Sequence, residues 1–465
     1  MRGDGIFMKS KKLTTFELYW YILGTAIGSG LFVLLPIAIG YTGRSVVLTL
    51  IVAGIMRLVT DLYSVTMASM FPLKGGQYSQ VSYLIPPLFS GVYGLVWLIS
   101  TLTLAAYATS AISYTAALIP GIARYSKIIA IVIVTFFFGL NYFGTKFGAK
   151  FQRAMTITLL LALAAFIIWG LPKVQFGSYT ENNFFLGGIS GFSGALAMCA
   201  WATDGILSTG ASLASEMDRP TRQVPKAMVG GVIIVITIYV LITFVAAGAL
   251  PIEQVAFQDL TVVAEHIFPR SIYVVFVLAG AVMALMTSLM GGVTVMRYPF
   301  EQMTEEGWLP AIFKRRTANG WPIVTMVVMY IMVMIPVIFG ISFDAIVSYC
   351  TFPGTFIVFY VDLKCMMLPK KYPELWKKSF MGKIPMPLYY VMCIAGAVGN
   401  LYMAYCYCAE MTLTDIGFMI LITIAMFAYS WFCLKTKRVD PSYLDAQKEA
   451  IAAEITEYER THQDI

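Results

Sequence analysis

The sequence predicts an all-α integral membrane protein with twelve transmembrane helices. Of its 465 residues, 59% are hydrophobic and only 12% are charged, which leaves too few polar side chains to cover a water-facing exterior. The mean hydropathy is +0.77, and the apolar residues form long, repeated runs. Within hydrocarbon only helices and closed barrels satisfy their own backbone hydrogen bonds, and the alternating pattern of barrel strands is absent from this sequence. Helices embedded in lipid are therefore the predicted architecture.

Each apolar run is close to the roughly 20 residues that a helix needs to cross a bilayer. No linker separates a second folded unit, so one transmembrane domain is expected over 1–438, followed by a cytoplasmic tail over 439–465 with Ala, Glu and Lys at helical spacing. The predicted spans are 14–39, 45–68, 88–119, 127–144, 153–171, 187–213, 226–250, 272–298, 322–340, 343–367, 387–408 and 413–435.

The basic residues predict the orientation, because Lys and Arg concentrate in cytoplasmic loops. With the N-terminus in the cytoplasm, most of the 32 Lys and Arg residues fall in cytoplasmic segments. Arg57 lies within a span, and the basic residues of the outside loops are Arg44, Arg124, Lys127, Lys173 and Arg270. We therefore expect a multi-pass protein of the plasma or inner membrane, surrounded by lipid, with both termini in the cytoplasm.

Composition also argues against several functions. The net charge of +7 is spread over separate loops without a nucleic-acid-binding module, so it is explained by contact with anionic lipid, and no nucleic acid partner is expected. The seven cysteines lie in the spans or at their ends, and the two histidines lie in a loop and in the tail. No disulfide, metal site or cofactor is therefore expected. Catalysis would need a nucleophile–base pair or a metal cluster within the spans, and neither is visible, so the chain is not expected to be an enzyme.

Two spans are interrupted by small and polar residues in the same way. The first contains 24–30 (GTAIGSG), and the sixth contains 201–205 (WATDG). Glycine weakens a helix, and Thr, Ser and Asp side chains compete for its backbone groups, so both spans are expected to unwind in mid-membrane. Unwound backbone at that depth is tolerated where it lines a cavity, although small residues also serve close helix packing. The occurrence of two such breaks, five spans apart, favours a binding site between two inverted repeats.

Charged residues in or beside the spans are further candidates. Arg57 and Asp61 lie four residues apart on one helical face and form either a gate element or a structural ion pair. Glu216 and Arg222, which begin a cytoplasmic loop, form either a gate contact or a solvated cluster. Asp204, in the second break, either neutralises a cationic group or a proton, or caps the half-helix that follows.

Four motifs carry a resemblance to a known family. Residues 24–32 read GTAIGSGLF, and the segments after spans 2, 6 and 8 read FPLKGGQY (71–78), SEMDRPTRQVPKA (215–227) and EEGWLP (305–310). In this order, they resemble motifs of the amino acid–polyamine–organocation (APC) superfamily of transporters. The third motif departs from the family pattern, because Asp218-Arg219-Pro220 stands where Asn-Pro is usual. The resemblance covers most of the chain.

The resemblance implies a LeuT-like fold, in which two inverted five-helix repeats and two peripheral helices hold a substrate at the midplane. Helices 1–5 would occupy about 14–171, helices 6–10 about 187–367 and helices 11–12 about 387–435. A substrate carboxylate would meet the free amides of the helix 1 break, and an ammonium would meet the carbonyls of the helix 6 break. Some members carry a lysine in span 5 that replaces a sodium ion. Residues 152–162 contain none, which leaves the coupling ion open.

The substrate-binding residues that the resemblance implies come from three regions. Those of the helix 1 break are Ile27, Gly28, Ser29 and Gly30. Those of the helix 6 break are Trp201, Ala202, Thr203, Asp204 and Gly205. Those of spans 3, 8 and 10 are Tyr93, Trp97, Thr101, Val293, Ser348 and Thr351.

The sequence therefore predicts a secondary active transporter of amino acids or related amines, working by alternating access as an exchanger or a proton symporter. A transporter of biogenic amines or polyamines is one alternative, because Asp204 could hold a second ammonium. The alternatives of another class are a membrane-embedded enzyme and a receptor, and the sequence lacks the extramembrane domain that a receptor would need. Competition between amines and amino acids for transport would distinguish the amino acid transporter from the amine transporter.

Overall fold

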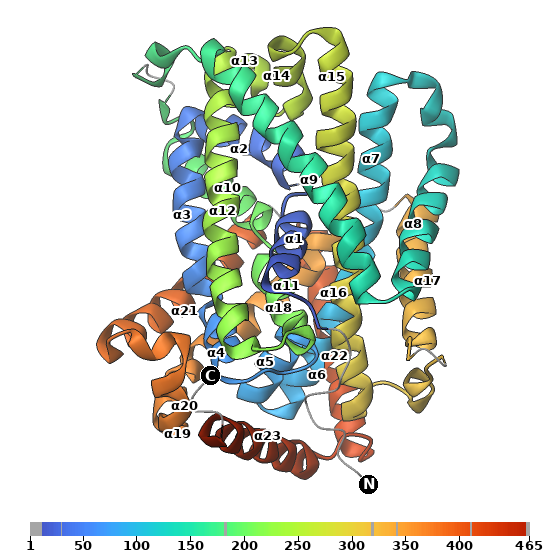
Figure 1. Ribbon diagram of the computed structural model, residues 1–465, viewed down its shortest axis with the longest axis vertical. Coiled ribbons are helices and arrows are strands. Elements are labelled where there is room, and N and C mark those ends of the chain that lie inside the picture. Colours follow the sequence, from blue (N-terminus) through green and yellow to red (C-terminus); the bar gives the residue numbers. More distant parts are fainter. Residues whose placement is uncertain are drawn as a thin grey trace.

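The computed structural model describes residues 12–28, 30–180, 184–317, 320–340, 343–409 and 412–461, and within them the chain folds as a bundle of helices (Figure 1). The extended structure in this part of the chain is one isolated bridge between Leu13 and Met217. The all-helical prediction is confirmed. Eight helical runs of the described residues are long and apolar enough to cross a membrane, and Ile323–Phe339 is a shorter apolar helix.

Helices cover the first six predicted spans, and spans 1, 2, 3 and 6 each consist of more than one helical piece. Span 1 joins its two α-helices through a π-helical turn, η1 (Gly30–Leu34), and span 3 joins them through a 3-10 turn, η3 (Thr101–Thr103). The helices are α1 Thr15–Ala26, α2 Leu35–Thr42, α3 Val46–Thr60, α4 Leu62–Met70, α5 Gly76–Leu84, α6 Pro87–Ser100, α7 Leu104–Leu118, α8 Ser126–Tyr142, α9 Thr145–Gly170, α10 Gly188–Ala202 and α11 Ile206–Ser212.

The second half of the chain also places helices over each predicted span. Span 8 contains a second π-helical turn, η9 (Val277–Val282). The helices are α12 Pro220–Ala249, α13 Ile252–Val255, α14 Leu260–Ile267, α15 Arg270–Phe276, α16 Met283–Glu306, α17 Ile323–Phe339, α18 Phe343–Cys365, α19 Leu368–Lys371, α20 Pro373–Lys378, α21 Met386–Ala409, α22 Leu413–Lys435 and α23 Pro441–Thr461.

Two helices begin earlier than hydropathy predicts. The spans expected from 153 and 226 start at Thr145, after Gly144 with φ of +86°, and at Pro220, at the first position of its helix. Proline suits that position because its ring fixes a helical φ and the first amides have no partner in any case. The first turns of both helices are polar, so apolar runs alone placed these starts too late.

The outer surface of the bundle is apolar, as a lipid-facing surface must be. Large side chains point outward from α8, α9 and α22, with Ile128, Leu161 and Leu421 each more than 60% exposed. A water-soluble chain rarely exposes so much contiguous apolar surface. Together with the eight long apolar helices, this surface identifies a multi-pass membrane protein.

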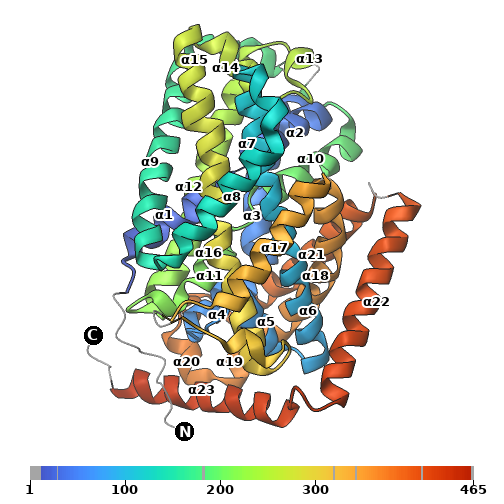
Figure 2. The same ribbon diagram turned by 90° about the vertical axis from the view of Figure 1, so that its right-hand side faces the viewer.

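Helix α1 lies in the middle of the bundle, packed against α9, α12 and α16 (Figure 1). Its start is fixed by a capping box, in which the amide of Glu17 donates to the hydroxyl of Thr14 (3.2 Å) and the amide of Thr14 donates to the carboxylate of Glu17 (2.8 Å). On another side of the bundle, α10 packs on α2 and α3, and α18 packs on α21. The interrupted helices are therefore central, whereas α22 stands at the edge (Figure 2).

The last helix, α23, lies across one end of the bundle and at a steep angle to α22 (Figure 2). It buries Leu444, Ala452 and Ile455, and its Lys448 carbonyl accepts a hydrogen bond from the hydroxyl of Tyr83 (3.3 Å). Burial lowers the pKa of the Lys448 ammonium, which lies 3.5 Å from Asp445. The expected helical tail is thus docked on one end of the bundle (Figure 1).

Candidate functional site

The breaks of span 1 and span 6 lie side by side. A Cβ added to Gly30 would lie 2.7 Å from the Cα of Ala202, and a Cβ added to Gly205 would lie 3.8 Å from the carbonyl oxygen of Thr25. The first distance is too short for any real side chain, so only glycine at position 30 allows this approach. The breaks, 175 residues apart in sequence, thus form one structural element. Of the first break, Ser29 lies outside the described residues.

Local sequence explains why the sixth span breaks where it does. The hydroxyl of Thr203 donates to the carbonyl of Ala200 (2.8 Å), which diverts that carbonyl from the regular helical pattern. Gly205 has φ of +85°, a conformation that glycine adopts without strain, and α11 begins at the next residue. Span 2 is also interrupted, because Asp61 separates α3 from α4.

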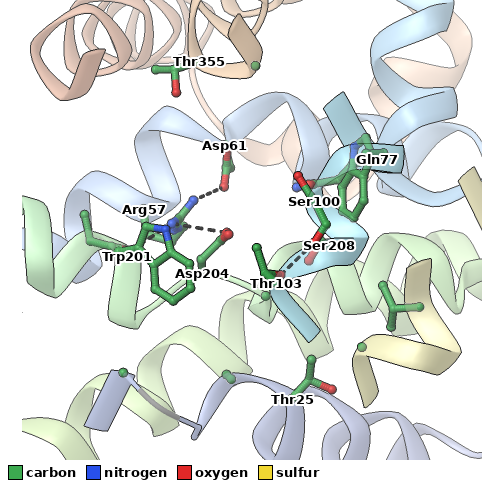
Figure 3. A pocket seen from close by; sticks show the side chains of 18 of the residues that line it. Thr25, Arg57, Asp61, Gln77, Ser100, Thr103, Trp201, Asp204, Ser208 and Thr355 are labelled. Carbon is green, nitrogen blue, oxygen red and sulfur yellow. Dashed lines mark hydrogen bonds and ion pairs between the residues drawn. The ribbon is translucent and has the colours of Figure 1, made fainter. Parts of the chain in front are cut away.

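A cavity of about 260 Å³ lies against both breaks (Figure 3). Of the predicted substrate-binding residues, those that line it are Gly28, Gly30, Tyr93, Trp97, Trp201, Ala202, Asp204 and Gly205. Its other polar lining residues, which sequence reasoning did not single out as substrate contacts, are Thr25, Arg57, Thr60, Asp61, Tyr63, Gln77, Ser100, Thr103, Tyr107, Ser208, Ser288, Thr355 and Asn400.

Several predicted contacts lie elsewhere. Ile27 and Thr203 are buried behind the lining residues of their own breaks. Thr101 is fully buried, and its hydroxyl donates to the carbonyl of Trp97 at 3.4 Å. Val293 is fully buried as well, outside the lining. The side chains of Ser348 and Thr351 lie outside the described residues, and α18 lines the cavity with Gly354, Thr355 and Val358.

Val293 does not line the cavity because it lies on another face of α16. The lining residues of this helix are Ser288, Gly292, Val295 and Met296, at the spacing of one helical face. Val293 is one residue beyond Gly292, and one residue rotates the side chain by about 100° around a helix. The position that the family resemblance implied therefore lies one residue away from the face that lines the cavity.

Arg57 connects the second span to the sixth. Its guanidinium lies 2.7 Å from Asp61 and 3.3 Å from Asp204, and it donates to the carbonyl of Ala200 at 2.9 Å (Figure 3). The pair with Asp61 agrees with the four-residue spacing, whereas the contact with Asp204 was not predicted. The guanidinium is therefore shared by two carboxylates at the cavity wall.

Asp204 projects into the cavity more than its neighbours do. Its side chain is 60% exposed, against 15% for Arg57 and 12% for Asp61. The helix that follows, α11, has Gly205 at its N-cap and no side-chain hydrogen bond there, so Asp204 does not cap it. Capping, one of the two roles considered for this residue, is therefore not what the structure shows.

Tyr239 on α12 holds the two breaks together. Its side chain is fully buried, and its hydroxyl lies 2.9 Å from the carbonyl oxygen of Ala26 and 3.2 Å from that of Ala202. One hydroxyl proton thus serves a carbonyl from each interrupted helix. The sequence signal was a lone tyrosine in the apolar run of span 7, which by itself does not identify its partners.

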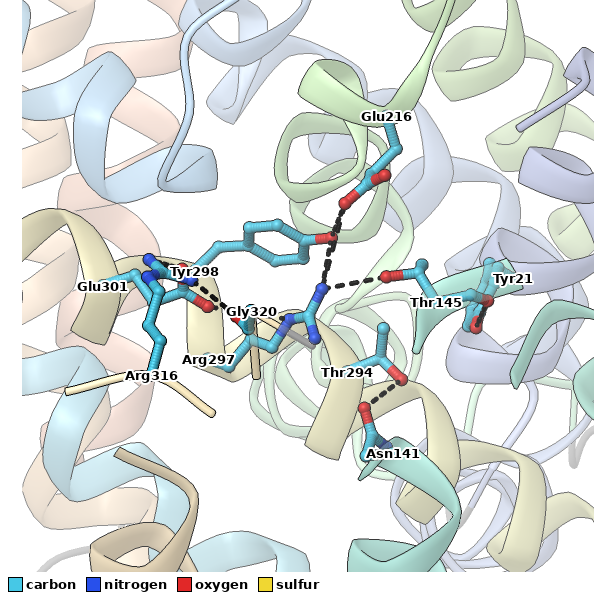
Figure 4. Close-up of polar contacts among 10 residues, drawn as sticks. All are labelled: Tyr21, Asn141, Thr145, Glu216, Thr294, Arg297, Tyr298, Glu301, Arg316 and Gly320. Carbon is cyan, nitrogen blue, oxygen red and sulfur yellow. Dashed lines mark hydrogen bonds and ion pairs between the residues drawn. The ribbon is translucent and has the colours of Figure 1, made fainter. Parts of the chain in front are cut away.

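Glu216 belongs to a second polar cluster, at the end of the bundle that holds α23. It accepts a hydrogen bond from the hydroxyl of Tyr298 (2.8 Å) and lies 3.8 Å from the guanidinium of Arg297 (Figure 4). Arg297 also donates to the hydroxyl of Thr145 on α9 at 2.8 Å. We call these four residues the Glu216 cluster. Arg222, the expected companion of Glu216, instead lines a separate surface pocket.

This geometry suits a ligand with both charges. The helix that resumes at Gly30 turns its amide end toward the break, which favours a negative group, and the amide of Leu31 donates there to the carbonyl of Gly28 at 3.3 Å. The carbonyls of the sixth span and the carboxylate of Asp204 favour a positive group. Within the described residues, no cluster of His, Cys, Asp and Glu has the arrangement of a metal site.

Comparison with known proteins gives a consistent result. Residues 13–430 match the amino acid permease family. The chain is 29% identical over 246 residues to the serine/threonine exchanger SteT of Bacillus subtilis, and the match covers 50% of this chain and 54% of the exchanger. It is 25% identical over 331 residues to the putrescine transporter PotE of Haemophilus influenzae (69% and 74%) and 26% identical over 261 residues to cationic amino acid transporter 1 of Arabidopsis thaliana (53% and 43%).

Proposed function

This chain belongs to the amino acid permease family, within the APC superfamily, whose members are transporters and not enzymes, and we propose that it is a secondary active transporter of amino acids or related amines. The observation that carries the proposal is the meeting of two broken helices at a polar cavity. Broken helices supply backbone donors and acceptors in mid-membrane, where a polar solute otherwise finds no partners. The names of the relatives point to the same class of substrate.

The proposal extends to binding and mechanism. The substrate carboxylate binds the amides at the start of η1, with Ser29 and Gly30 as donors, and the ammonium binds near Asp204 and the carbonyls of Trp201 and Ala202. The chain adopts a LeuT-like arrangement of twelve transmembrane helices and works by alternating access as an exchanger or a proton symporter. Both termini lie in the cytoplasm of a cell whose plasma or inner membrane holds the protein.

A polyamine or biogenic amine carrier is a second candidate, and one observation favours it. The cavity wall carries two carboxylates, Asp61 and Asp204, against the single guanidinium of Arg57. The exposed Asp204 is placed to receive a second cation. A carrier of this kind would accept a diamine that has no carboxylate.

Counterflow in proteoliposomes tests both candidates. Vesicles loaded with one unlabelled compound are diluted into labelled serine, lysine or putrescine, and accumulation is followed at several pH values. We expect at least one amino acid to exchange and to be displaced by other amino acids. Displacement by amines alone would favour the second candidate, and no exchange of any tested amino acid or amine would contradict the proposal.

Gly30→Leu provides the matched inactive control, because a side chain there would overlap Ala202 and fill the approach to the break. It should reach the membrane and fail to exchange. Undiminished counterflow in that variant would show that the helix 1 break has no role in binding.

A further inference from the structure

Asp362 on α18 is a buried carboxyl group that the proposed substrate site does not use. Its side chain is 1% exposed. One oxygen, Oδ2, accepts a hydrogen bond from the side-chain amide of Asn400 on α21 at 2.8 Å. The other, Oδ1, is buried and meets no hydrogen-bond partner among the described residues. Half of this carboxyl is therefore unsatisfied.

The charges around Asp362 would not neutralise a negative charge on its carboxyl group. The charged group that faces it is Asp61, at the junction of α3 and α4, and Asp61 is already paired with Arg57. The other ionisable neighbours are Tyr63 on α4, Cys393 on α21 and Cys365 on α18 itself.

The remaining helices around α18 supply no cation either. The ion pairs of the described residues include none that joins a lysine or an arginine to this carboxyl. Lys364, two residues further along α18, lies over the ring of Tyr360 instead. A carboxylate at position 362 would thus face another carboxylate with no cation of its own.

The hydrogen-bond donor of this carboxyl is itself a residue of the cavity wall. Asn400, its hydrogen-bond donor, lines the cavity and also donates to the carbonyl of Thr60 at 2.9 Å, and Thr60 lines the cavity too. Val358, one turn before Asp362 on α18, is a third lining residue. One turn before Asn400, α21 also approaches closely at Gly396, where an added Cβ would lie 3.1 Å from the same Oδ2.

Burial of an ionised carboxylate without a cation beside it is strongly unfavourable, and such groups bind a proton instead. The neutral acid removes the repulsion with Asp61. We propose that Asp362 is a proton-binding site, loaded in this conformation, which exchanges its proton with the cavity during the transport cycle. The first part stands on the geometry alone, and the exchange during transport rests on the proposed function.

The chemistry is a simple proton transfer. The O–H bond of the Asp362 carboxyl breaks, and the proton passes to water in the cavity once Asn400 or Thr60 moves aside. The carboxylate that remains then needs a positive charge nearby. A solute ammonium entering the cavity, or Arg57 released from Asp204, supplies one, so occupancy of the cavity and protonation of Asp362 influence each other.

Infrared spectroscopy of the purified protein without substrate tests the first part. A protonated carboxyl in an apolar site has a distinct C=O stretch, which shifts in D₂O. We expect this band in the wild type and in the exposed control variant Asp445→Asn, and its loss in Asp362→Asn. A wild-type spectrum without the band, or an unchanged band in Asp362→Asn, would overturn the proposal.

A second variant tests the same proposal in a protein that keeps Asp362, so the result does not depend on the folding of Asp362→Asn. Asn400→Ala removes the donor that stabilises the ionised form, so the carboxyl band should persist to higher pH than in the wild type. A shift to lower pH, or none, would count against Asp362 as the titrating group.

Transport measurements test the second part. With labelled serine, lysine or putrescine, whichever gives counterflow, Asp362→Asn should still exchange, because exchange needs no net proton movement, but its uptake should no longer respond to an imposed pH gradient. A wild-type response in that variant would overturn the coupling role. If the wild type moves none of these compounds, the proposed function fails, while the infrared result still decides whether Asp362 holds a proton.

Discussion

At the scale of single residues, the cavity is organised by a few charges that the sequence predicted only in part. The pairing of Arg57 with Asp61 follows from their four-residue spacing on one helix. The contact of Arg57 with Asp204 joins spans 2 and 6, and no local pattern determines how two distant helices rotate against each other. Val293 shows the same limit, because a small error in helix rotation moves a side chain out of the cavity. Residue types could be predicted here, and cross-helix partners could not.

Asp204→Asn tests the role of the exposed carboxylate. The substitution keeps a hydrogen-bonding oxygen and removes the charge, while Arg57 retains Asp61 as its partner. We expect apparent affinity for a substrate ammonium to fall by about tenfold, or roughly 1.4 kcal/mol, and the pH dependence of transport to change. Concentration-dependent counterflow at several pH values measures both.

Asp204→Ala is the companion variant for this test. It removes the oxygen as well as the charge, and because the side chain caps no helix in the structure, both variants should unfold at similar temperatures. Wild-type kinetics at every pH in Asp204→Asn would show that the charge takes no part in transport.

At the scale of elements, the two breaks are the feature that the sequence predicts best. Glycine and hydroxyl-bearing residues in otherwise apolar spans have a direct local effect on helix stability, so the position of each break is visible without tertiary information. The partner that joins them, Tyr239, is not visible, because its role depends on where α12 lies. The π-helical turn η1 after the first break was likewise not predicted.

Tyr239→Phe tests the link between the breaks. The substitution keeps the ring and removes the hydroxyl, which leaves two buried carbonyls without their donor. Loss of a partner for a buried polar group costs about 1–3 kcal/mol, so the midpoint of thermal unfolding should fall measurably. Tyr19→Phe is a matched control, because its hydroxyl donates to the carbonyl of Lys226 at an exposed position and its loss should have a smaller effect. Equal destabilisation by the two variants would argue against a special role for Tyr239.

At the scale of the whole molecule, hydropathy located the helical spans but not the pieces between them. The short helices α5, α13, α14, α19 and α20 are too short or too polar to register as spans, and they close the two ends of the bundle. The docking of α23 depends on contacts such as that of Tyr83 with Lys448, which are far apart in sequence. One end of the molecule gathers α23, Leu13 and the Glu216 cluster. There the amide of Leu13 donates to the carbonyl of Glu216 at 2.7 Å.

Cysteine labelling in sealed cells tests the orientation of the whole bundle. The probe positions Lys127, Arg270, Lys74 and Lys314 are all exposed, so access depends only on the side of the membrane. A membrane-impermeant maleimide should label Lys127→Cys and Arg270→Cys but not Lys74→Cys or Lys314→Cys. The five native cysteines that the structure describes are buried and should give little background. Labelling of the last two variants in sealed cells would reverse the proposed topology.

The guanidinium of Arg57 acts on Asp204 as a tethered competitor. Because it is attached to α3, its effective concentration at that carboxylate is high even though the contact is a single 3.3 Å approach. In the proposed site, a substrate ammonium that takes the place of the guanidinium has to displace it, so the affinity of Asp204 for that ammonium would be a difference between two binding free energies. After such a substrate leaves, the arginine would return without a diffusion step. On the proposed function, Asp204 would therefore bind its substrate weakly and release it readily, which favours turnover over retention.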